Sequence, residues 1–291
     1  MKVLVTGANG QLGHDVVNEL RKRGHEAITT DIAGNMDYLL DITKEEVVSS
    51  VKQIVPEAII HCAAWTAVDA AEDEENKEKV YAINVIGTQN LVKAAEMLDC
   101  KFLYLSTDYV FDGQGETPWK PDDKSYEPLC YYGETKLKGE LAVAELEKYF
   151  IVRIAWVFGR YGKNFIQTMI NVGKTHDEVR VVNDQIGTPT YTFDLARLLV
   201  DMIETEKYGY YHATNEGGYI SWYDFCEEIY RQAGLKTKVI PVTTLEYGLS
   251  KAKRPFNSRL DKSKLSENGF ERLPDWKDAL KRYLIEIGYG E

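Results

Sequence analysis

Three glycines near the amino terminus constrain the fold of this chain more than any other feature. They stand in the segment Gly7-Ala-Asn-Gly10-Gln-Leu-Gly13, directly after the short apolar run Lys2–Thr6. In a strand-turn-helix unit the first glycine permits the turn, the second lets the backbone approach a phosphate, and the third packs the helix on the strand. The segment therefore predicts a βαβ unit that binds a dinucleotide, with an ordinary structural turn as the alternative.

Strand and helix patterns alternate along the first 160 residues. Short apolar runs predict buried parallel strands, and apolar residues spaced three and four apart predict helices. Thr43 followed by Glu46 has the spacing of a capping box at the start of the second helix. This alternation predicts an α/β fold with a Rossmann-like, doubly wound parallel sheet. The expected strands are Lys2–Thr6, Glu26–Asp31, Ala58–His61, Lys101–Ser106 and Phe150–Ala155, and the expected helices are Gln11–Arg23, Thr43–Gln53, Asn76–Leu98 and Tyr131–Tyr149.

The pattern becomes less regular after residue 160. We expect a dinucleotide-binding domain at residues 1–160 and a smaller, mainly substrate-binding region at residues 161–291, with room for helices and strands of the two to interleave. In the second part, helices are expected at Asn164–Lys174, Thr192–Glu204, Ser221–Ala233 and Trp276–Ile287, and short strands at Val179–Val182, Tyr210–His212 and Val239–Ile240.

Charge and cysteine content narrow the class of partner. The chain carries 46 Asp and Glu residues against 35 Lys and Arg, a net charge of −11, which argues against a nucleic-acid or anionic-membrane partner. An anionic dinucleotide must then be bound by local backbone N–H groups. No stretch has the roughly 18–20 apolar residues of a membrane span. The amino-terminal residues lack a signal-peptide pattern, so we expect a cytoplasmic protein whose four cysteines are reduced.

Tyr132 and Lys136 form the pair that carries the expected chemistry. Four residues apart on a helix, their side chains share one face, and an ammonium close to a phenol lowers the pKa of that phenol. Ser106 and Thr107 end the fourth expected strand, and a hydroxyl there could donate to a substrate carbonyl; the pair downstream favours Thr107 for this role. Each signal alone is weak, because solvated Tyr-Lys pairs and capping threonines are common. Together with the glycine turn they predict hydride transfer from a nicotinamide coupled to protonation of the oxygen.

The sequence signals for the other candidate contacts are weaker. Asp31 ends the second strand, where a carboxylate would hold the adenine ribose 2′-hydroxyl and favour NAD, although a turn aspartate has the same pattern. The small residues of Cys62-Ala-Ala-Trp65, after the third strand, would either lie against a cofactor or pack tightly. Trp156 would either stack on a sugar ring or fill the core. The five histidines have no metal-site spacing, so no catalytic metal is expected.

Longer segments resemble the extended short-chain dehydrogenase/reductases that act on nucleotide sugars, and among them the dTDP-4-dehydrorhamnose reductases. The resemblance implies NADPH-dependent reduction of dTDP-4-dehydro-β-L-rhamnose to dTDP-L-rhamnose, with NADH as a second possible cofactor. The matching segments are Gly10-Gln-Leu-Gly13, Ala63-Ala-Trp-Thr-Ala-Val-Asp69, Ser106-Thr-Asp-Tyr-Val-Phe-Asp-Gly113, Tyr132-Gly-Glu-Thr-Lys-Leu-Lys-Gly-Glu140, Asp184-Gln-Ile-Gly-Thr-Pro189 and Arg254-Pro-Phe-Asn-Ser258.

The resemblance also implies roles for particular residues. Tyr132 is the implied proton donor, Lys136 the assisting lysine, and Thr107 the hydroxyl that bonds the carbonyl. Besides these and the glycines Gly7 and Gly13 of the turn, the expected cofactor contacts are Gly10, Gln11, Leu12, Asp31, Asp41, Ile42, Ala63, Ala64 and Trp65. The implied substrate contacts are Val68, Thr107, Asp108, Tyr109 and Trp156, with Gln185 and Thr188 closing the pocket.

Tyr109 separates reduction from dehydration. Related 4,6-dehydratases carry Thr-Asp-Glu at this place, and a phenol cannot replace the glutamate as a base that removes a carbon-bound proton. An epimerase or dehydratase of the same superfamily remains an alternative, as does a non-catalytic subunit that binds a dinucleotide without turnover. Some family members form metal-bridged dimers through glutamates. Asp15 and Phe193 occupy the two positions here, so no bridging metal is expected, while a homodimer stays possible.

Overall fold

The computed structural model describes residues 1–289 and is built around a seven-stranded sheet in the order β11-β6-β5-β4-β1-β2-β3. Every neighbouring pair runs parallel. The order grows outward from β1 on both sides, which confirms the predicted doubly wound sheet and puts the topological switch point between β1 and β4. The strands are β1 (Lys2–Thr6), β2 (Glu26–Asp31), β3 (Tyr38–Leu39), β4 (Ala58–His61), β5 (Lys101–Thr107), β6 (Tyr149–Ile154) and β11 (Gly209–His212).

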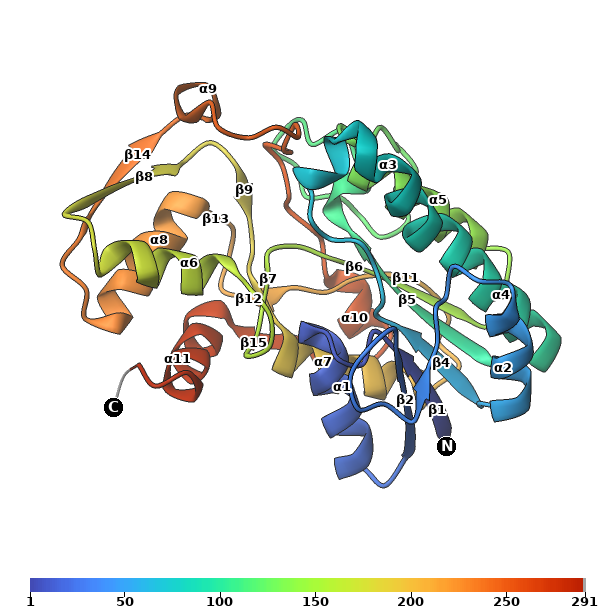
Figure 1. Cartoon of the computed structure of the whole chain (residues 1–291). Coiled ribbons are helices and arrows are strands. Elements are labelled where there is room, and N and C mark those ends of the chain that lie inside the picture. The colour runs from blue at the N-terminus through green and yellow to red at the C-terminus, as the bar shows by residue number, and fades with distance from the viewer. Residues whose placement is uncertain (290–291) are drawn as a thin grey trace.

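Helices cover both faces of this sheet (Figure 1). Strand side chains alternate between the two faces, so Val3 and Val5 of β1 join one apolar cluster and Leu4 joins the other. The first cluster includes α1 (Gln11–Lys22) and α7 (Thr192–Ile203). The second includes α2 (Glu46–Ile54), α4 (Gly87–Leu98) and α5 (Tyr131–Val143).

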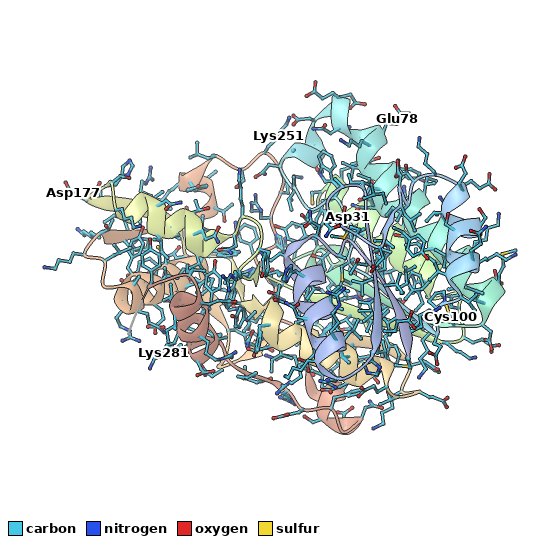
Figure 2. The ribbon with its side chains drawn as sticks, turned by 60° about the horizontal axis from the view of Figure 1, so that its bottom comes forward. Asp31, Glu78, Cys100, Asp177, Lys251 and Lys281 are labelled. Carbon is cyan, nitrogen blue, oxygen red and sulfur yellow. The ribbon has the colours of Figure 1, made fainter. Side chains whose placement is uncertain are left out.

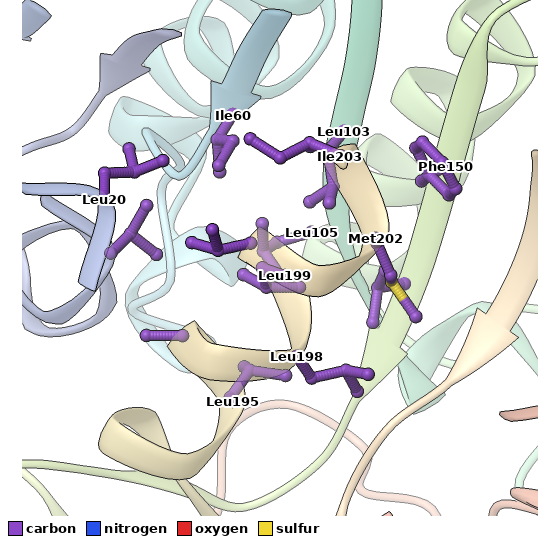
Figure 3. Close-up of a cluster of buried hydrophobic side chains, with 14 of the residues drawn as sticks. Leu20, Ile60, Leu103, Leu105, Phe150, Leu195, Leu198, Leu199, Met202 and Ile203 are labelled. Atoms are coloured by element: carbon purple, nitrogen blue, oxygen red, sulfur yellow. The ribbon is translucent and has the colours of Figure 1, made fainter. Parts of the chain in front are cut away.

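The elements α7 and β11 come from the second half of the chain, yet they complete the sheet and one helical layer. Figure 3 shows Leu195, Leu198 and Leu199 of α7 in the cluster that also holds Leu20 of α1 and Ile60 of β4. Strand β11 pairs with β6 along its whole length. The division at residue 160 stays a prediction, and these two elements belong with the dinucleotide-binding part.

One predicted helix contains an irregular turn. The expected helix Asn76–Leu98 consists of α3 (Glu74–Tyr81), one π-helical turn η2 (Ala82–Ile86) and α4. In that turn the Asn84 amide accepts a bond from the Trp65 backbone N–H at 2.8 Å and donates to the Thr135 hydroxyl at 3.0 Å. A π-turn inserts one extra residue and commonly marks a functional site. Apolar periodicity alone does not reveal it.

Two helix boundaries differ from expectation. The predicted capping box of Thr43 and Glu46 is wrong, because α2 begins at Glu46 without a side-chain cap and the Thr43 hydroxyl donates to Asp41 at 2.7 Å. Helix α5 ends at Val143 rather than at Tyr149, which begins β6. In both cases a local contact or a strand pairing competes with helical propensity.

A smaller region follows β6 and lies to the left in Figure 1, with its own apolar and aromatic core. Asp177 and Lys281 mark it in Figure 2, whereas Cys100 lies at the opposite side of the molecule. The region contains the parallel strands β8 (Glu178–Val182) and β14 (Lys238–Val242) and the helices α6 (Phe165–Gly173), α8 (Trp222–Ala233) and α11 (Trp276–Glu286).

The remaining helices and strands are short. Among residues 1–289 no helix combines the length and the apolar character that crossing a membrane requires. The short strands are β7 (Val157–Phe158), β9 (Ile186–Gly187), β10 (Thr190–Tyr191), β12 (Asn215–Glu216), β13 (Ile220–Ser221) and β15 (Leu273–Asp275), and the short helices are η1 (Ala70–Glu72), η3 (Asp108–Val110), α9 (Thr244–Tyr247) and α10 (Ser263–Glu267).

Candidate active site

The glycine turn between β1 and α1 leaves no room for side chains at two of its positions. Gly7 has a φ of +64°, and a Cβ there would lie 2.6 Å from the backbone nitrogen of Ala63. A Cβ on Gly13 would lie 2.1 Å from the Gly7 carbonyl oxygen. Gly10 donates its N–H to that same carbonyl at 2.9 Å and precedes the first residue of α1. Gly7 and Gly13 therefore shape the turn, as predicted from their spacing.

The amino terminus of α1 is suited to an anion. No side chain caps this helix, and its first turn contains no acidic residue. The first N–H groups of a helix lack partners within the helix, and the helix dipole favours negative charge there. The residues present therefore fit the diphosphate of a dinucleotide.

A cavity of about 510 Å³ lies next to this helix terminus, at the carboxyl ends of β4, β5 and β6. It brings together the start of α1, the three predicted catalytic residues and most of the predicted substrate contacts. The predicted site residues that line it are Gly10, Gln11, Leu12, Ala64, Val68, Thr107, Asp108, Tyr109, Tyr132, Lys136 and Trp156.

Several lining residues were not among the predicted contacts. Most of them stand at strand ends, so the rule that ligands bind at the carboxyl edge of a parallel sheet could have found them. Lys163, in the loop before α6, has no such signal in the sequence. The additional lining residues are His61, Thr66, Leu105, Ile154, Ala155, Val157, Gly162 and Lys163, and the cavity is also lined by Cys62 and Ser106, which the sequence offered as weaker candidates.

Three predicted cofactor contacts lie around this cavity without lining it. Asp31 accepts hydrogen bonds from the backbone N–H groups of Ile32 at 2.7 Å and Asn9 at 3.2 Å, which holds it beside the glycine turn. It lies near the centre of the view in Figure 2. Ala63 packs under Gly7, and Trp65 is fixed by Asn84. Their contribution to cofactor binding stays a prediction.

Neither Asp41 nor Ile42 lines this cavity. The Asp41 carboxylate accepts bonds from the Thr43 N–H at 3.0 Å and the Thr43 hydroxyl at 2.7 Å. Ile42 is buried against Gly87, where an added Cβ would lie 2.6 Å from the Ile42 Cδ1 atom. The observed contacts of both side chains are therefore contacts within the fold.

Gln185 and Thr188 do not close the main cavity. The Thr188 hydroxyl is buried and donates to the Gly218 carbonyl at 2.9 Å. Gln185 lines a second cavity of about 310 Å³ and donates to the Thr244 hydroxyl at 3.0 Å. Arg254, for which the sequence predicted no role, also lines this second cavity.

The three predicted catalytic residues come from two neighbouring elements. Thr107 ends β5, and its oxygen accepts a bond from the Tyr109 N–H at 3.3 Å while its proton is donated to Asp108 at 3.0 Å. Tyr132 and Lys136 share one face of α5, as their spacing predicts, and both line the cavity. The Lys136 ammonium donates to the Leu105 carbonyl at 2.7 Å.

The ionisation of this pair differs from expectation. Burial raises the pKa of Tyr132 well above its ordinary value, and the predicted lowering by Lys136 is not found. Burial also lowers the pKa of Lys136 to about 7, against smaller raising effects of Glu140 and Cys62. Desolvation disfavours the charged form of both groups, and neither group is a cause of the other's pKa shift. The phenol is therefore protonated at neutral pH, and the amine gives up its proton far more readily than an ordinary lysine.

Tyr109 connects the main cavity to the second one. Its ring packs edge-on against the Tyr132 ring, with the centroids 5.6 Å apart. Its hydroxyl accepts a bond from Arg254 at 3.1 Å, and the same guanidinium forms a 2.6 Å ion pair with Asp69. Burial is the main cause that raises the pKa of Tyr109. Tyr109 is therefore a fixed neutral phenol beside the proton donor.

Trp156 has an unusual backbone conformation for a large side chain. Its φ is +51°, and its ring stacks on Trp222 with a centroid distance of 3.8 Å. It both lines the cavity and contacts the core of the smaller region, so the two interpretations considered for it are compatible. A strained backbone at such a position is typical of a functional site.

The two positions considered for a bridging metal are those of Asp15 and Phe193. Asp15 accepts a hydrogen bond from the Thr192 hydroxyl at 2.5 Å. Phe193 is 55% exposed and has no metal-binding atom. In the described part of the chain, no group of three or more His, Cys, Asp or Glu side chains is arranged to hold a metal ion.

Comparison with known proteins assigns the chain to a family. The family model described as "RmlD substrate binding domain" matches residues 1–288. A dTDP-4-dehydrorhamnose reductase from Aggregatibacter actinomycetemcomitans is 40% identical over 96% of this chain and 97% of its own. The chain belongs to the dTDP-4-dehydrorhamnose reductase family. The resemblance stated from the sequence motifs is thereby confirmed.

Solved structures of the dTDP-4-dehydrorhamnose reductase family superimpose closely on this fold. The enzyme from Clostridium acetobutylicum has a TM-score of 0.92 and 44% identity, covering 99% of each chain. The enzyme from Bacillus anthracis, solved in complex with NADP, has a TM-score of 0.91 and 42% identity, covering 98% of this chain and 100% of its own. The cofactor bound to that relative agrees with the prediction of NADPH.

Asp31 is expected to limit the preference of this family member for NADPH. We predict that Asp31→Ser raises the ratio of kcat/KM with NADPH to that with NADH by at least about tenfold. At an effective dielectric constant of about 20, charges about 5 Å apart repel by roughly 3 kcal/mol, and about 1.4 kcal/mol corresponds to tenfold. Asp41→Ser is the matched control, because the Asp41 carboxylate is bound by Thr43, whereas Asp31 is held beside the glycine turn by the Asn9 N–H. An equal change in both variants would contradict the assignment.

Proposed function

We propose that this chain reduces dTDP-4-dehydro-β-L-rhamnose to dTDP-L-rhamnose with NADPH. The observation that carries the proposal is that one cavity is lined both by a helix terminus that fits a diphosphate and by Thr107, Tyr132 and Lys136. The names of the relatives supply the sugar nucleotide, and the NADP complex of the Bacillus anthracis enzyme supplies the cofactor.

The cofactor-binding residues hold and orient the dinucleotide. When bound, the nicotinamide supplies the hydride that converts the keto carbon to an alcohol carbon. In the proposed arrangement the N–H groups at Gln11 and Leu12 bind the diphosphate beside Gly10, and the small side chain of Ala64 allows close approach at the sheet edge. Because the whole chain is acidic, this local binding replaces attraction by the overall charge.

Tyr132 supplies the proton that the reduced oxygen needs. Because burial raises its pKa, the phenol keeps its proton at neutral pH until negative charge develops on the keto oxygen. The proton then moves from the Tyr132 oxygen to the sugar oxygen and leaves a tyrosinate. Lys136, on the same face of α5, stabilises that tyrosinate when its amine is protonated.

Dehydration and epimerisation are less well supported by the same site. A dehydratase needs a base beside the sugar, and Tyr109 occupies the place where related dehydratases carry glutamate. The Tyr109 hydroxyl is bound to Arg254, and its pKa is raised by burial, so it does not act as a base at neutral pH. A non-catalytic role is disfavoured because Thr107, Tyr132 and Lys136 line one cavity.

One assay distinguishes these functions. Purified protein is mixed with NADPH or NADH and a panel of 4-keto sugar nucleotides, while the absorbance of the reduced nicotinamide and the product are followed. We expect one NADPH to be consumed for each alcohol formed from the rhamnose precursor. Product without net consumption of NADPH would indicate an epimerase or dehydratase. Binding of NADPH without turnover on any member of the panel would indicate a regulatory subunit.

The proposed partner is a small sugar nucleotide, and the proposed compartment is the cytoplasm. All four cysteines are free, and three of them are buried, which supports a reducing environment. The net charge of −11 supports the absence of a nucleic-acid partner. Light scattering at several protein concentrations would decide whether the chain forms a homodimer.

A further inference from the structure

Asp108 is a buried acid beside the proposed reacting centre. It is the first residue of η3, directly after β5, and only 2% of it is exposed. It lines the main cavity, and its Oδ2 atom has no hydrogen-bond partner of ordinary geometry, although the nearby Ser258 hydroxyl lowers the pKa of the carboxyl group. The Ser106 hydroxyl, also buried in the wall of this cavity, lacks a partner as well. Unpaired buried polar atoms are rare in folded proteins, and here two of them meet at one cavity.

The second carboxylate oxygen has a defined partner. Asp108 Oδ1 accepts the Thr107 proton at 3.0 Å. A threonine hydroxyl has a single proton, so Thr107 cannot donate to a keto oxygen while this bond is made. An ionised carboxylate is also a stronger acceptor than a neutral carbonyl. If Asp108 were charged during turnover, it would withdraw one of the expected donors from the reacting oxygen.

The surroundings of Asp108 favour its neutral form more than water does, so that this form is the minority at pH 7 and the main form below about pH 6. Among residues 1–289, no Lys, Arg or His forms an ion pair with it. Burial raises its pKa to about 6, against smaller lowering effects of Ser258, Thr107 and nearby backbone groups. The titratable groups that face it are the phenols Tyr109 in η3 and Tyr132 in α5, both of which are neutral. Lys136 lines the same cavity from α5 but donates to the Leu105 carbonyl.

We propose that Asp108 acts as a neutral acid whose Oδ2–H donates a hydrogen bond to the keto oxygen of the substrate. Asp108 is then a further catalytic residue, because it touches the reacting oxygen together with Tyr132. A buried carboxylic acid that keeps its proton can stabilise developing negative charge without giving the proton away. The inference rests on the proposed function, since it assumes that a keto oxygen occupies the cavity.

The first test compares pH profiles of wild type, Asp108→Asn and Asp108→Ala. An asparagine has the shape of the neutral acid and donates from Nδ2 at every pH. We expect wild-type kcat to fall as pH rises from about 6 to 8, because the donating proton is lost above the pKa of Asp108. Asp108→Asn should lose the part of the decline near pH 6 and keep only the part near pH 7 that belongs to Lys136. Asp108→Ala should lose about 100-fold in kcat below pH 6, with a smaller loss at higher pH and little change in KM.

Two kinetic outcomes would overturn the proposal. If Asp108→Asn keeps the whole decline, including its part near pH 6, the decline belongs to Lys136 alone, whose pKa of about 7 lies in this range. If Asp108→Ala raises KM and leaves kcat unchanged, Asp108 only holds a part of the sugar that does not react. NADPH affinity measured by fluorescence checks that each variant keeps its folded cofactor site.

A second test does not depend on turnover. The carboxyl carbon of Asp108 is followed by NMR in protein labelled with ¹³C-aspartate, and Asp108→Asn identifies its signal. We expect a titration midpoint near 6, compared with about 4 for an ordinary aspartate. A midpoint at or below 4 would overturn the proposal even if the reductase activity were established. Conversely, absence of turnover with a midpoint near 6 would contradict the proposed function and leave the neutral acid in place.

Discussion

Replacing Tyr132 with phenylalanine is expected to lower kcat by about 10²–10⁴-fold while leaving NADPH affinity within about twofold of wild type. The variant removes only the hydroxyl, so the ring keeps its edge-on contact with Tyr109 and its place in the apolar cluster. Without the phenolic proton, the alkoxide formed by hydride transfer has no acid beside it. Steady-state turnover and fluorescence titration with NADPH measure the two effects.

Tyr131→Phe is the matched control for this experiment. Tyr131 begins the same helix, but its hydroxyl donates to the Lys77 carbonyl at 3.3 Å, and the residue does not line the main cavity. We expect its kcat to remain close to that of wild type. Equal losses in both variants would show that the damage comes from the helix rather than from the missing proton. Near-normal turnover of Tyr132→Phe would refute the role assigned to Tyr132.

Replacing Glu140 with glutamine is expected to reduce the free energy of unfolding by about 3–5 kcal/mol. The Glu140 carboxylate forms two bonds with Arg153, at 2.8 and 2.9 Å, and both side chains are 0% exposed. Arginine keeps its charge at any working pH, so the variant leaves an uncompensated buried cation. Because a domain is commonly stable by only about 5–15 kcal/mol, this loss should be visible as a large fall in melting temperature.

Glu134→Gln is the matched control on the same helix. Glu134 pairs with Lys138 at 2.7 Å, and these two side chains are 50% and 43% exposed. An exposed pair four residues apart on a helix contributes about 0.3–0.5 kcal/mol. Urea unfolding of both variants provides the comparison. A loss below about 1 kcal/mol for Glu140→Gln would show that the surroundings replace the missing charge.

The buried pair also explains why α5 is held firmly. Arg153 lies on β6 and reaches Glu140 on α5, the Pro121 carbonyl at 3.1 Å and the Tyr126 hydroxyl at 3.0 Å. Glu140 follows Lys136 by four residues, so the ion pair lies one helical turn beyond the amine. The position of Tyr132 and Lys136 against β5 therefore depends on a contact outside the cavity.

The sheet and the glycine turn could be predicted because they depend mainly on residues close in the sequence. The Gly13 contact with the Gly7 carbonyl lies within one turn, and the period-two alternation of β1 is visible in five residues. The same holds for the shared face of Tyr132 and Lys136, which follows from helical spacing. These local rules placed the three expected catalytic residues at one cavity.

Contacts between distant residues could not be predicted in the same way. Arg254 meets Asp69 and Tyr109 only because the loop before α10 returns to the mouth of the cavity. The ionisation of Tyr132 depends on how deeply it is buried, and helical spacing carries no information on burial of that degree. Gln185 belongs to a motif of the family, yet it lines the second cavity, because β9 leads it away from the main one.

The return of the chain to the large sheet limits how this fold can diversify. Between β6 and β11 the chain enters the smaller region, comes back as α7, and completes the sheet edge before leaving again. Exchange of the whole carboxyl-terminal half with that of a relative would also replace the helix packed on α1 and the strand beside Arg153. Changes in sugar preference are therefore expected to accumulate as point substitutions in the short connecting segments, rather than by recombination of an intact module.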